Sequence, residues 1–424
     1  MARALLAAVF GVVMCVLTVV SSTGQDAAAP AAADRRTPGS GGQQARATGP
    51  ASEPTSTPAS PSDSPSASPS DSPSTSPSEP ATTTSPDPEC SPETPLVDRA
   101  ATPEAVCLVA TLDRWRAAGR YGLGQQLNVS NSDYLAPLEQ LRPERPAVVG
   151  FDLDELALGE TYDFATPPLQ SLLELNEEGV VLTASWHTLN PGTGGDSYDR
   201  GWQDVGALLR PGNAAYTAFW RDVDAKIALL LRLQTGDDGQ HAPAAVVFRP
   251  LHEANGDWFW WAQGTDPSTY QALYAAIQQR AADAGVHNVV WGWSANARND
   301  ARIADPLTLL PDRVDLVGID SYEAMADKSA QDDRLDLPGL AELAGRVPRA
   351  AVTEAGPHGS AQGAWDPARV APSATAAGVS PAYVMMWFDD GDGSDGTTGK
   401  KQLGSLRGGR SLLASCPDGV CPVP

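Results

Sequence analysis

The sequence predicts a (β/α)8 barrel, a TIM barrel of the α/β class, preceded by a signal peptide and a disordered Pro/Ser/Thr-rich linker. Eight short apolar runs lie downstream of residue 97, and most are rich in valine without polar alternation, which is typical of strands buried on both faces. Amphipathic helical patterns lie between the runs, and all eleven tryptophans fall between Trp115 and Trp387. We therefore expect one barrel domain over residues 97–424, with an open doubly wound sheet as the alternative.

The start of the chain has the pattern of an exported protein. An apolar run from Leu5 to Val20 follows Arg3, which predicts a signal peptide over residues 1–25 or, alternatively, an uncleaved membrane anchor. Residues 26–96 are mainly Ala, Pro, Ser and Thr, with a proline at every fourth position from Pro61 to Pro77. Such a segment has too little apolar surface to fold, so we expect a disordered linker. The protein is expected to be secreted, and the linker could tether it to the cell envelope.

The eight runs are the expected strands of the barrel. They cover residues 122–127, 147–151, 180–186, 245–248, 289–293, 314–319, 350–353 and 383–387. Among the helices between them, one begins after Asn213 and keeps its apolar side chains on one face as far as Leu231. Another has Asp266 as its N-cap, Pro267 at its first position and Gly285 after its end. Strands alternating with helices favour a barrel built from repeated β/α units.

The charge of the chain limits its partners. Acidic residues outnumber basic ones by 52 to 29, which gives a formal net charge of −23. Nucleic acids and anionic membrane surfaces are polyanions, so neither is expected to bind. A neutral or cationic ligand suits this charge better, and we expect a monomer.

Four cysteines remain once the signal peptide is removed: Cys90, Cys107, Cys416 and Cys421. An even number of cysteines in an exported chain indicates disulfide bonds. Three connectivities exist. Proximity favours Cys90 with Cys107 and Cys416 with Cys421, whereas either crossed arrangement would join the two ends of the folded region.

Two glutamates are the candidate catalytic residues. Glu253 and Glu354 lie just past the ends of the fourth and seventh runs, and barrels carry their active sites at the C-terminal ends of the strands. Two carboxyl groups across a barrel mouth can hydrolyse a glycoside, with one as acid and the other as nucleophile or base. A separation of about 5 to 5.5 Å would predict retention of configuration. Either glutamate taken alone is more typical of a surface or salt-bridged residue.

Aromatic residues near these glutamates suggest sugar binding. Trp258, Phe259, Trp260 and Trp261 follow Glu253, and aromatic faces cover the apolar faces of sugar rings. The same cluster is also typical of a hydrophobic core, and we expect Trp260 or Trp261 to pack inward. Further candidates at strand ends are His187, His252, Tyr322 and Trp387. His241 and His287 flank helices and are assigned no function.

Two further motifs are not expected to be functional. The acidic loop of Asp389, Asp390, Asp392 and Asp395 resembles a calcium loop but lacks the distal glutamate of an EF-hand, so no metal site is assigned. A formal glycosylation sequon begins at Asn128, where we expect burial. Hydrolysis by two carboxylates needs no cofactor, and none is predicted.

The segment FRPLHEANGDWFWWA, residues 248–262, resembles glycoside hydrolase family 26, which is best known for β-mannanases. Further similar segments follow the family's order: VGFD at 149–152, SWH at 185–187, WGWSAN at 291–296, VDLVGIDSY at 314–322, VTEAG at 352–356 and MMW at 385–387. Residues 1–96 lie outside the resemblance. It implies a retaining mechanism with Glu253 as acid/base and Glu354 as nucleophile.

The resemblance also implies roles for neighbouring side chains. Tyr322 would hydrogen-bond the nucleophile, and Arg249 would keep Glu354 ionised. Glu253 must start protonated, so its pKa is expected to be the higher of the two. The implied substrate-binding residues are His187, Arg249, His252, Trp258, Tyr322 and Trp387.

The expected polysaccharide substrates are mannan, glucomannan and galactomannan, cleaved within the chain at β-1,4 bonds. One position departs from the family pattern: many of its mannanases have Arg after the Trp of the eighth run, where this sequence has Phe388. A mixed-linkage β-glucan, β-1,3-xylan or a cell-envelope glycan is therefore the alternative substrate. A non-catalytic carbohydrate-binding protein is the third hypothesis.

Overall fold

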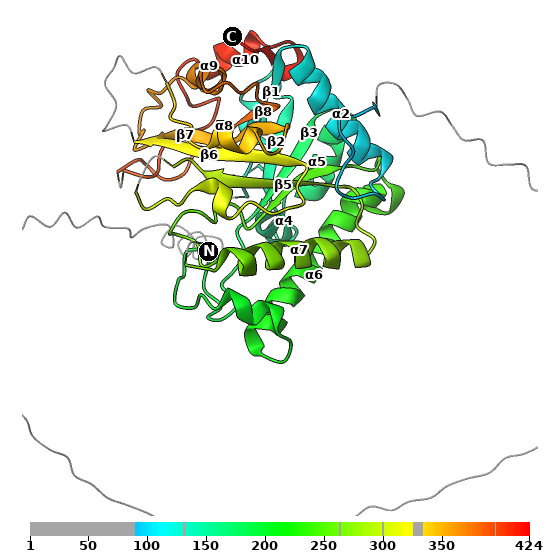
Figure 1. The fold of residues 1–424 in the computed structure, drawn as a ribbon. Helices are drawn as coiled ribbons and strands as arrows, with labels where there is room; N and C mark the ends of the chain where they lie inside the picture. Colours follow the sequence, from blue (N-terminus) through cyan, green and yellow to red (C-terminus); the bar gives the residue numbers. More distant parts are fainter. Residues whose placement is uncertain (1–89, 130–132, 263, 299–300, 325–333, 395) are drawn as a thin grey trace, which may run out of the picture. The chain divides into compact units, whose positions relative to one another are not determined.

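The computed structural model describes residues 90–424 except 130–132, 263, 299–300, 325–333 and 395 (Figure 1). The expected signal peptide and nearly all of the expected linker lie outside the described residues. No helix in the described part is long and apolar enough to cross a membrane.

Eight parallel strands form a closed barrel. They are β1 (Arg120–Gln126), β2 (Val148–Asp152), β3 (Val181–Trp186), β4 (Val246–Pro250), β5 (Val289–Asn296), β6 (Leu316–Ala324), β7 (Ala350–His358) and β8 (Tyr383–Met386). Each strand pairs in parallel with the next, and β1 pairs with both β2 and β8, as in the register Gln125 to Met386. The barrel prediction is confirmed, and the open-sheet alternative is wrong.

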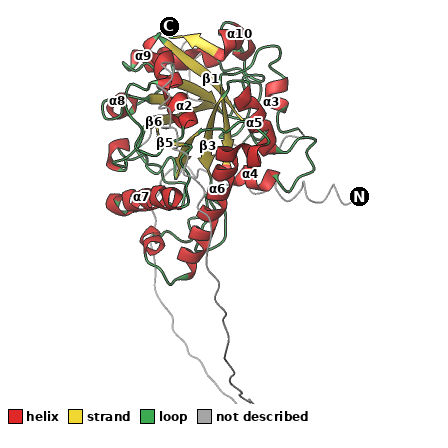
Figure 2. Ribbon diagram, turned by 90° about the vertical axis from the view of Figure 1, so that its right-hand side faces the viewer, coloured by secondary structure: helices red, strands yellow, loops and turns green. Residues whose placement is uncertain are grey.

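Helices surround the strands (Figure 2). They are α2 (Pro103–Ala117), α3 (Ala136–Glu139), α4 (Leu153–Gly159), α5 (Pro168–Glu177), α6 (Ala214–Gly239), α7 (Pro267–Asp283), α8 (Leu340–Ala344), α9 (Val370–Ala376) and α10 (Gly409–Ala414). The two predicted N-caps are confirmed, because Asn213 accepts from the Tyr216 amide and Asp266 accepts from the Thr269 amide. These caps satisfy amides that the first helical turn leaves without partners.

Helix α2 covers the N-terminal end of the barrel (Figure 1). Its residues Leu108, Val109 and Leu112 share a buried cluster with side chains from the strands, Val181 and Val247 among them. This helix is fastened to its surroundings by polar contacts as well, since Arg349 bonds Asp113 at 2.7 and 2.8 Å. One end of the barrel is therefore closed, and the C-terminal ends of the strands remain as the place for a site.

Two disulfide bonds lie at the ends of the described chain. Cys90 is joined to Cys107 on α2, and Cys416 is joined to Cys421. These are the two pairings that proximity favoured. Cys421 of the second disulfide lies in a short strand that was not predicted from the sequence, β9 (Val420–Pro422). This strand pairs antiparallel with β1.

Candidate active site

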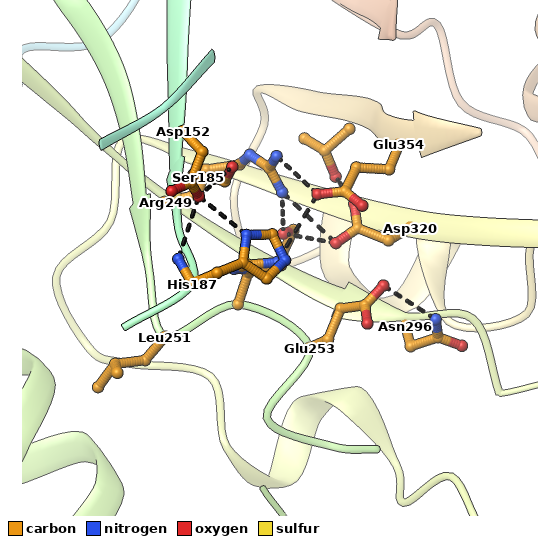
Figure 3. A network of polar contacts seen from close by, with 12 residues as sticks. Asp152, Ser185, His187, Arg249, Leu251, Glu253, Asn296, Asp320 and Glu354 are labelled. Carbon is orange, nitrogen blue, oxygen red and sulfur yellow. Dashed lines mark hydrogen bonds and ion pairs between the residues drawn. The ribbon is translucent and has the colours of Figure 1, made fainter. Parts of the chain in front are cut away.

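The chain after β4 places Glu253 through an unusual backbone. Leu251 has φ 53° and Glu253 has φ 52°, in the left-handed region that non-glycine residues rarely adopt. Each costs about 1 to 2 kcal/mol. The complete burial of Leu251 and a 2.9 Å hydrogen bond from the Glu253 amide to the Ser294 carbonyl hold this conformation. The turn brings the Glu253 side chain beside Asn296, below Asp320 and Glu354 in the view of Figure 3.

Among the described residues, the donors to the Glu253 carboxyl are uncharged. Its Oε2 accepts from the Trp258 indole nitrogen at 2.7 Å, and its Oε1 accepts from the Asn296 amide at 3.0 Å. The indole reaches Glu253 across Gly256, where an added Cβ would lie 2.4 Å from the Trp258 ring. A side chain at position 256 would therefore displace the indole.

Glu354 on β7 has a charged partner instead. Its Oε1 accepts from Arg249 Nη2 at 2.9 Å, and its Oε2 accepts from the Tyr322 hydroxyl at 2.8 Å (Figure 3 draws the first). His252 Nε2 lies 3.8 Å from the same Oε1. Glu354 is 3 % exposed. A guanidinium at this distance favours the ionised carboxylate.

A third buried carboxylate, Asp320, shares the Arg249 guanidinium. Arg249 Nη1 lies 3.4 Å from Asp320 Oδ2 and donates to the Ser294 hydroxyl at 2.7 Å. One oxygen from each of Glu253, Asp320 and Glu354 lies within 4.8 Å of the others. Retaining glycosidases separate their two carboxyl groups by about 5 to 5.5 Å and inverting ones by about 6.5 to 9.5 Å, so this spacing fits retention.

Burial dominates the titration of the two glutamates. The pKa of Glu253 and of Glu354 is raised from 4.5 to about 8; burial is the largest cause, the charge of Asp320 adds to it, and the charge of Arg249 opposes it. The pKa of Glu253 is raised to the same extent as that of Glu354, so the expected difference between the two is absent. The two groups differ in their partners: the cation bonds Glu354 directly, whereas Glu253 has only the indole and the amide. Those contacts make Glu354 the residue that is better suited to carry the negative charge.

Two histidines next to Glu354 have pKa values that are shifted in opposite directions. His187 Nδ1 bonds Asp152 at 2.8 Å, and the rings of His187 and His252 lie 4.6 Å apart. Burial opposes the charged form of His187, but the hydrogen bond and charge of Asp152 outweigh burial and raise its pKa. Burial lowers the pKa of His252 well below 6.5, and the charges of His187 and Arg249 lower it further. His252 is therefore neutral, and its Nδ1 has no hydrogen-bond partner among the described residues.

Aromatic rings form the walls around these groups. Trp387 lies 6.1 Å from the His187 ring and 6.4 Å from the Tyr322 ring, and Phe388 stacks on Trp387 at 4.7 Å. The structure thus brings together all the binding residues named from the sequence: His187, Arg249, His252, Trp258, Tyr322 and Trp387. Of the cluster after Glu253, Phe259, Trp260 and Trp261 are buried in the core, as expected for at least one of the tryptophans.

The residues without an assigned function lie in other contacts. His241 pairs with Glu177 at 3.3 Å, and His287 pairs with Asp98 at 2.8 Å. Asn128 is buried, at 5 % exposed, as predicted. Asp395 lies outside the described residues.

Sequence reasoning missed three polar residues of the site. Asp152 ends β2, Asn296 ends β5, and Asp320 lies in the middle of β6, directly after the predicted run 314–319; all three are buried. Each contacts a residue that the sequence did single out, namely His187, Glu253 and Arg249. Their signal was a polar side chain near the C-terminal end of an otherwise apolar strand.

A closed barrel whose mouth holds two close carboxyl groups and aromatic walls is the arrangement that glycoside hydrolysis requires. The profile of glycosyl hydrolase family 26 matches residues 135–391, and the chain belongs to this family. The resemblance drawn from the sequence is thereby confirmed.

Relatives and solved structures agree with this membership. A mannan endo-1,4-β-mannosidase of Bifidobacterium adolescentis is 31 % identical over 324 residues, covering 68 % of this chain and 31 % of that protein. One of Thermothelomyces thermophilus is 31 % identical over 191 residues, covering 42 % of this chain and 37 % of that protein. This chain thus spans about a third of the length of these two relatives.

Among solved structures, the catalytic domain of an endo-β-1,4-mannanase from Bacillus sp. JAMB-750 has a TM-score of 0.57 at 24 % identity, over 76 % of this chain and 90 % of that one. A Cellulomonas fimi endo-β-1,4-mannanase double mutant has a TM-score of 0.55 at 25 % identity, over 70 % and 71 %. The first likeness supports the barrel fold.

Proposed function

We propose that this protein is an endo-β-mannanase that cleaves β-1,4-mannosidic bonds in mannan, glucomannan or galactomannan by double displacement. Glu354 is the nucleophile and Glu253 the acid/base. The observation that carries the proposal is the pairing of Glu354 with Arg249 and Tyr322, within 4.8 Å of a Glu253 carboxyl that has uncharged donors only. The relatives named above are mannan endo-1,4-β-mannosidases, which supports mannan as the substrate class.

In the first step the Glu354 carboxylate attacks the anomeric carbon of the sugar. The bond from that carbon to the glycosidic oxygen breaks, and its electron pair goes to the leaving oxygen, which takes the proton of Glu253. The product is a glycosyl ester on Glu354. Arg249 and Tyr322 hold the attacking carboxylate in position for this step.

In the second step Glu253, now ionised, takes a proton from a water molecule. The resulting hydroxide attacks the anomeric carbon, and the Glu354 carboxylate leaves with the electron pair of the ester bond. Two inversions give net retention. Because the ester removes the negative charge of Glu354, the pKa of Glu253 falls in the intermediate, which suits its change from acid to base.

The remaining side chains bind the sugar. Trp258 and Trp387 offer aromatic faces, and His252 lies beside the nucleophile with its Nε2 3.8 Å from Glu354 Oε1. His187, held by Asp152, is placed to donate to a sugar oxygen. We also propose that the protein works outside the cell, because the apolar run near its N-terminus is typical of a secretory signal.

The deciding experiment measures reducing-sugar release by the full chain from galactomannan, glucomannan, lichenan and β-1,3-xylan. Glu253→Ala and Glu354→Ala are the test variants, and Glu342→Ala on the exposed side of α8 is the matched control. We expect release from the two mannans, lost by orders of magnitude in both test variants and kept in the control. Release from lichenan or xylan alone would replace the proposed substrate, and full activity of either test variant would exclude the assigned roles.

Azide separates the two roles. With 2,4-dinitrophenyl β-mannobioside, which needs no acid, azide should rescue Glu354→Ala and give the α-glycosyl azide by a single inversion. Glu253→Ala should instead give the β-glycosyl azide, because azide then attacks the ester on Glu354. The opposite assignment of products would reverse the two roles.

A further inference from the structure

The loop that follows β8 buries a lysine beside the site. Lys401 is 1 % exposed, and its ammonium lies 5.7 Å from the centre of the Tyr322 ring. We propose that Lys401 is a positioning residue for the reaction, which acts on Glu354 through Tyr322. This inference rests on the proposed function, because it takes Glu354 as the nucleophile.

The loop holds the lysine in place through its own acidic residues. The Lys401 ammonium pairs with the Asp390 carboxylate and donates to the Thr397 carbonyl at 3.0 Å. Asp389 accepts from the backbone amides of Lys401 and Gln402 at 2.8 and 2.9 Å. Asp389 and Asp390 of the acidic loop, which resembled a calcium loop in the sequence, therefore hold Lys401 in place.

The alkyl chain of Lys401 is fixed as well. It crosses β7 at Gly356, where an added Cβ would lie 3.1 Å from Lys401 Cγ. Gly356 pairs with Tyr322 in the β6 to β7 register and lies two residues after Glu354. Lys401 thus lies over the segment that carries the nucleophile and against the ring that bonds it.

The ring of Tyr322 transmits the effect of the lysine. A cation within about 6 Å of an aromatic ring is attracted by the ring's electrons, more strongly when water is excluded. That attraction and the His358 ring, stacked at 4.9 Å and 15°, fix the orientation of the phenol. The cation also draws electron density from the ring, so the hydroxyl becomes a stronger donor to Glu354 Oε2, 2.8 Å away.

Loss of the Lys401 ammonium should impair attack by the nucleophile but not protonation of the leaving group. We compare kcat/KM of the full chain on 2,4-dinitrophenyl and phenyl β-mannobiosides, because only the second needs the Glu253 proton. Lys401→Met should lower kcat/KM by about threefold to tenfold on both substrates by the same factor, mainly through kcat. Lys401→Arg keeps the charge and should restore at least half of the activity.

Two comparisons make the test specific. Lys400→Met changes the neighbouring, partly exposed lysine, which bonds Asp389 at 3.1 Å, and should keep kcat/KM within about twofold of the wild type. In a Tyr322→Phe background the hydroxyl is absent, so Lys401→Met should have almost no further effect. A Lys401→Met protein as active as the wild type, or a loss that persists without the Tyr322 hydroxyl, overturns the inference.

A folding defect would not hide the outcome. Lys401→Met leaves Asp390 without its ammonium partner, so the double variant Asp390→Asn with Lys401→Met is measured if the single variant melts early. Failure of the proposed function is recognised separately, since the wild type would then not hydrolyse either mannobioside or Glu354→Ala would keep its activity.

Discussion

The indole nitrogen of Trp258 donates a hydrogen bond to Glu253 Oε2 at 2.7 Å. One half-buried side chain therefore belongs both to the wall of the mouth and to the environment of a carboxyl group whose pKa is raised to about 8. The indole favours the ionised carboxylate, so it opposes the effect of burial on this group.

Trp258→Phe should shift the alkaline limb of the pH profile of kcat/KM upward. Without the indole donor the ionised form of Glu253 loses stabilisation, its pKa rises further, and it stays protonated to higher pH. A hydrogen bond to a charged group corresponds to a shift of about one unit. Trp220→Phe is the control, because its indole bonds the Leu208 carbonyl instead. An unchanged or lowered limb would show that the indole does not control this titration.

Glu253→Gln should make the protein more stable relative to the wild type as the pH rises. Burial gives Glu253 a folded pKa of about 8 against 4.5 when unfolded, so its contribution to stability is complete below 4.5 and is lost as the pH rises through about 8. Glutamine does not ionise and avoids this loss. Urea unfolding at pH 4.5 and pH 8 should show a difference that grows by about 2 to 4 kcal/mol in favour of the variant. A difference that shrinks as the pH rises would contradict the expectation.

Asp152→Asn should lower the pKa of His187. The aspartate is what outweighs burial at this histidine, so its neutral replacement leaves burial as the main influence and disfavours the imidazolium. An NMR titration of the histidine side chains measures the change. Asp98→Asn, next to His287, is the matched control and should leave the His187 titration as in the wild type. If His187 titrates in the Asp152→Asn variant as it does in the wild type, the ion pair does not set its charge.

The two disulfides should differ in their effect on stability. Cys90 and Cys107 are 17 residues apart, whereas Cys416 and Cys421 are 5 apart, and a longer closed loop restricts the unfolded chain more. Replacing both cysteines of a pair by alanine should cost about 3 kcal/mol for the first and about 2 kcal/mol for the second. Urea unfolding of the two double variants makes the comparison. A larger loss from the shorter loop would point to contacts of β9 with β1 rather than to loop closure.

Much of the barrel could be predicted because buried strands and capped helices leave local signals. The run at 289–293 lies within β5, and Asn213 and Asp266 cap their helices as expected. The strands extend further where polar residues follow the runs: β6 continues through Tyr322 to Ala324, because pairing with β7 holds these residues extended. Such pairing joins residues that are far apart in the chain, so a short segment of sequence does not predict it.

Glu253 and Glu354 could be predicted because each places a carboxyl group, which can act as acid or nucleophile, at the C-terminal end of a predicted strand. Site residues whose role depends on contacts with other strands could not be predicted. Asp320 becomes a site residue only because Arg249 reaches it from another strand, and the left-handed backbone at Leu251 has no signal in residue type. Lys401 lies far beyond Tyr322 in the sequence, and only the closed barrel brings the two side chains together.

The sharing of Arg249 between two carboxylates has an electrical consequence. With Asp320 and Glu354 both ionised, one guanidinium faces two anions. The mouth then carries a surplus of one negative charge, shielded from water. A neutral sugar does not balance it, but the oxocarbenium character that develops at the anomeric carbon does. The unbalanced charge thus favours the transition state over the bound sugar.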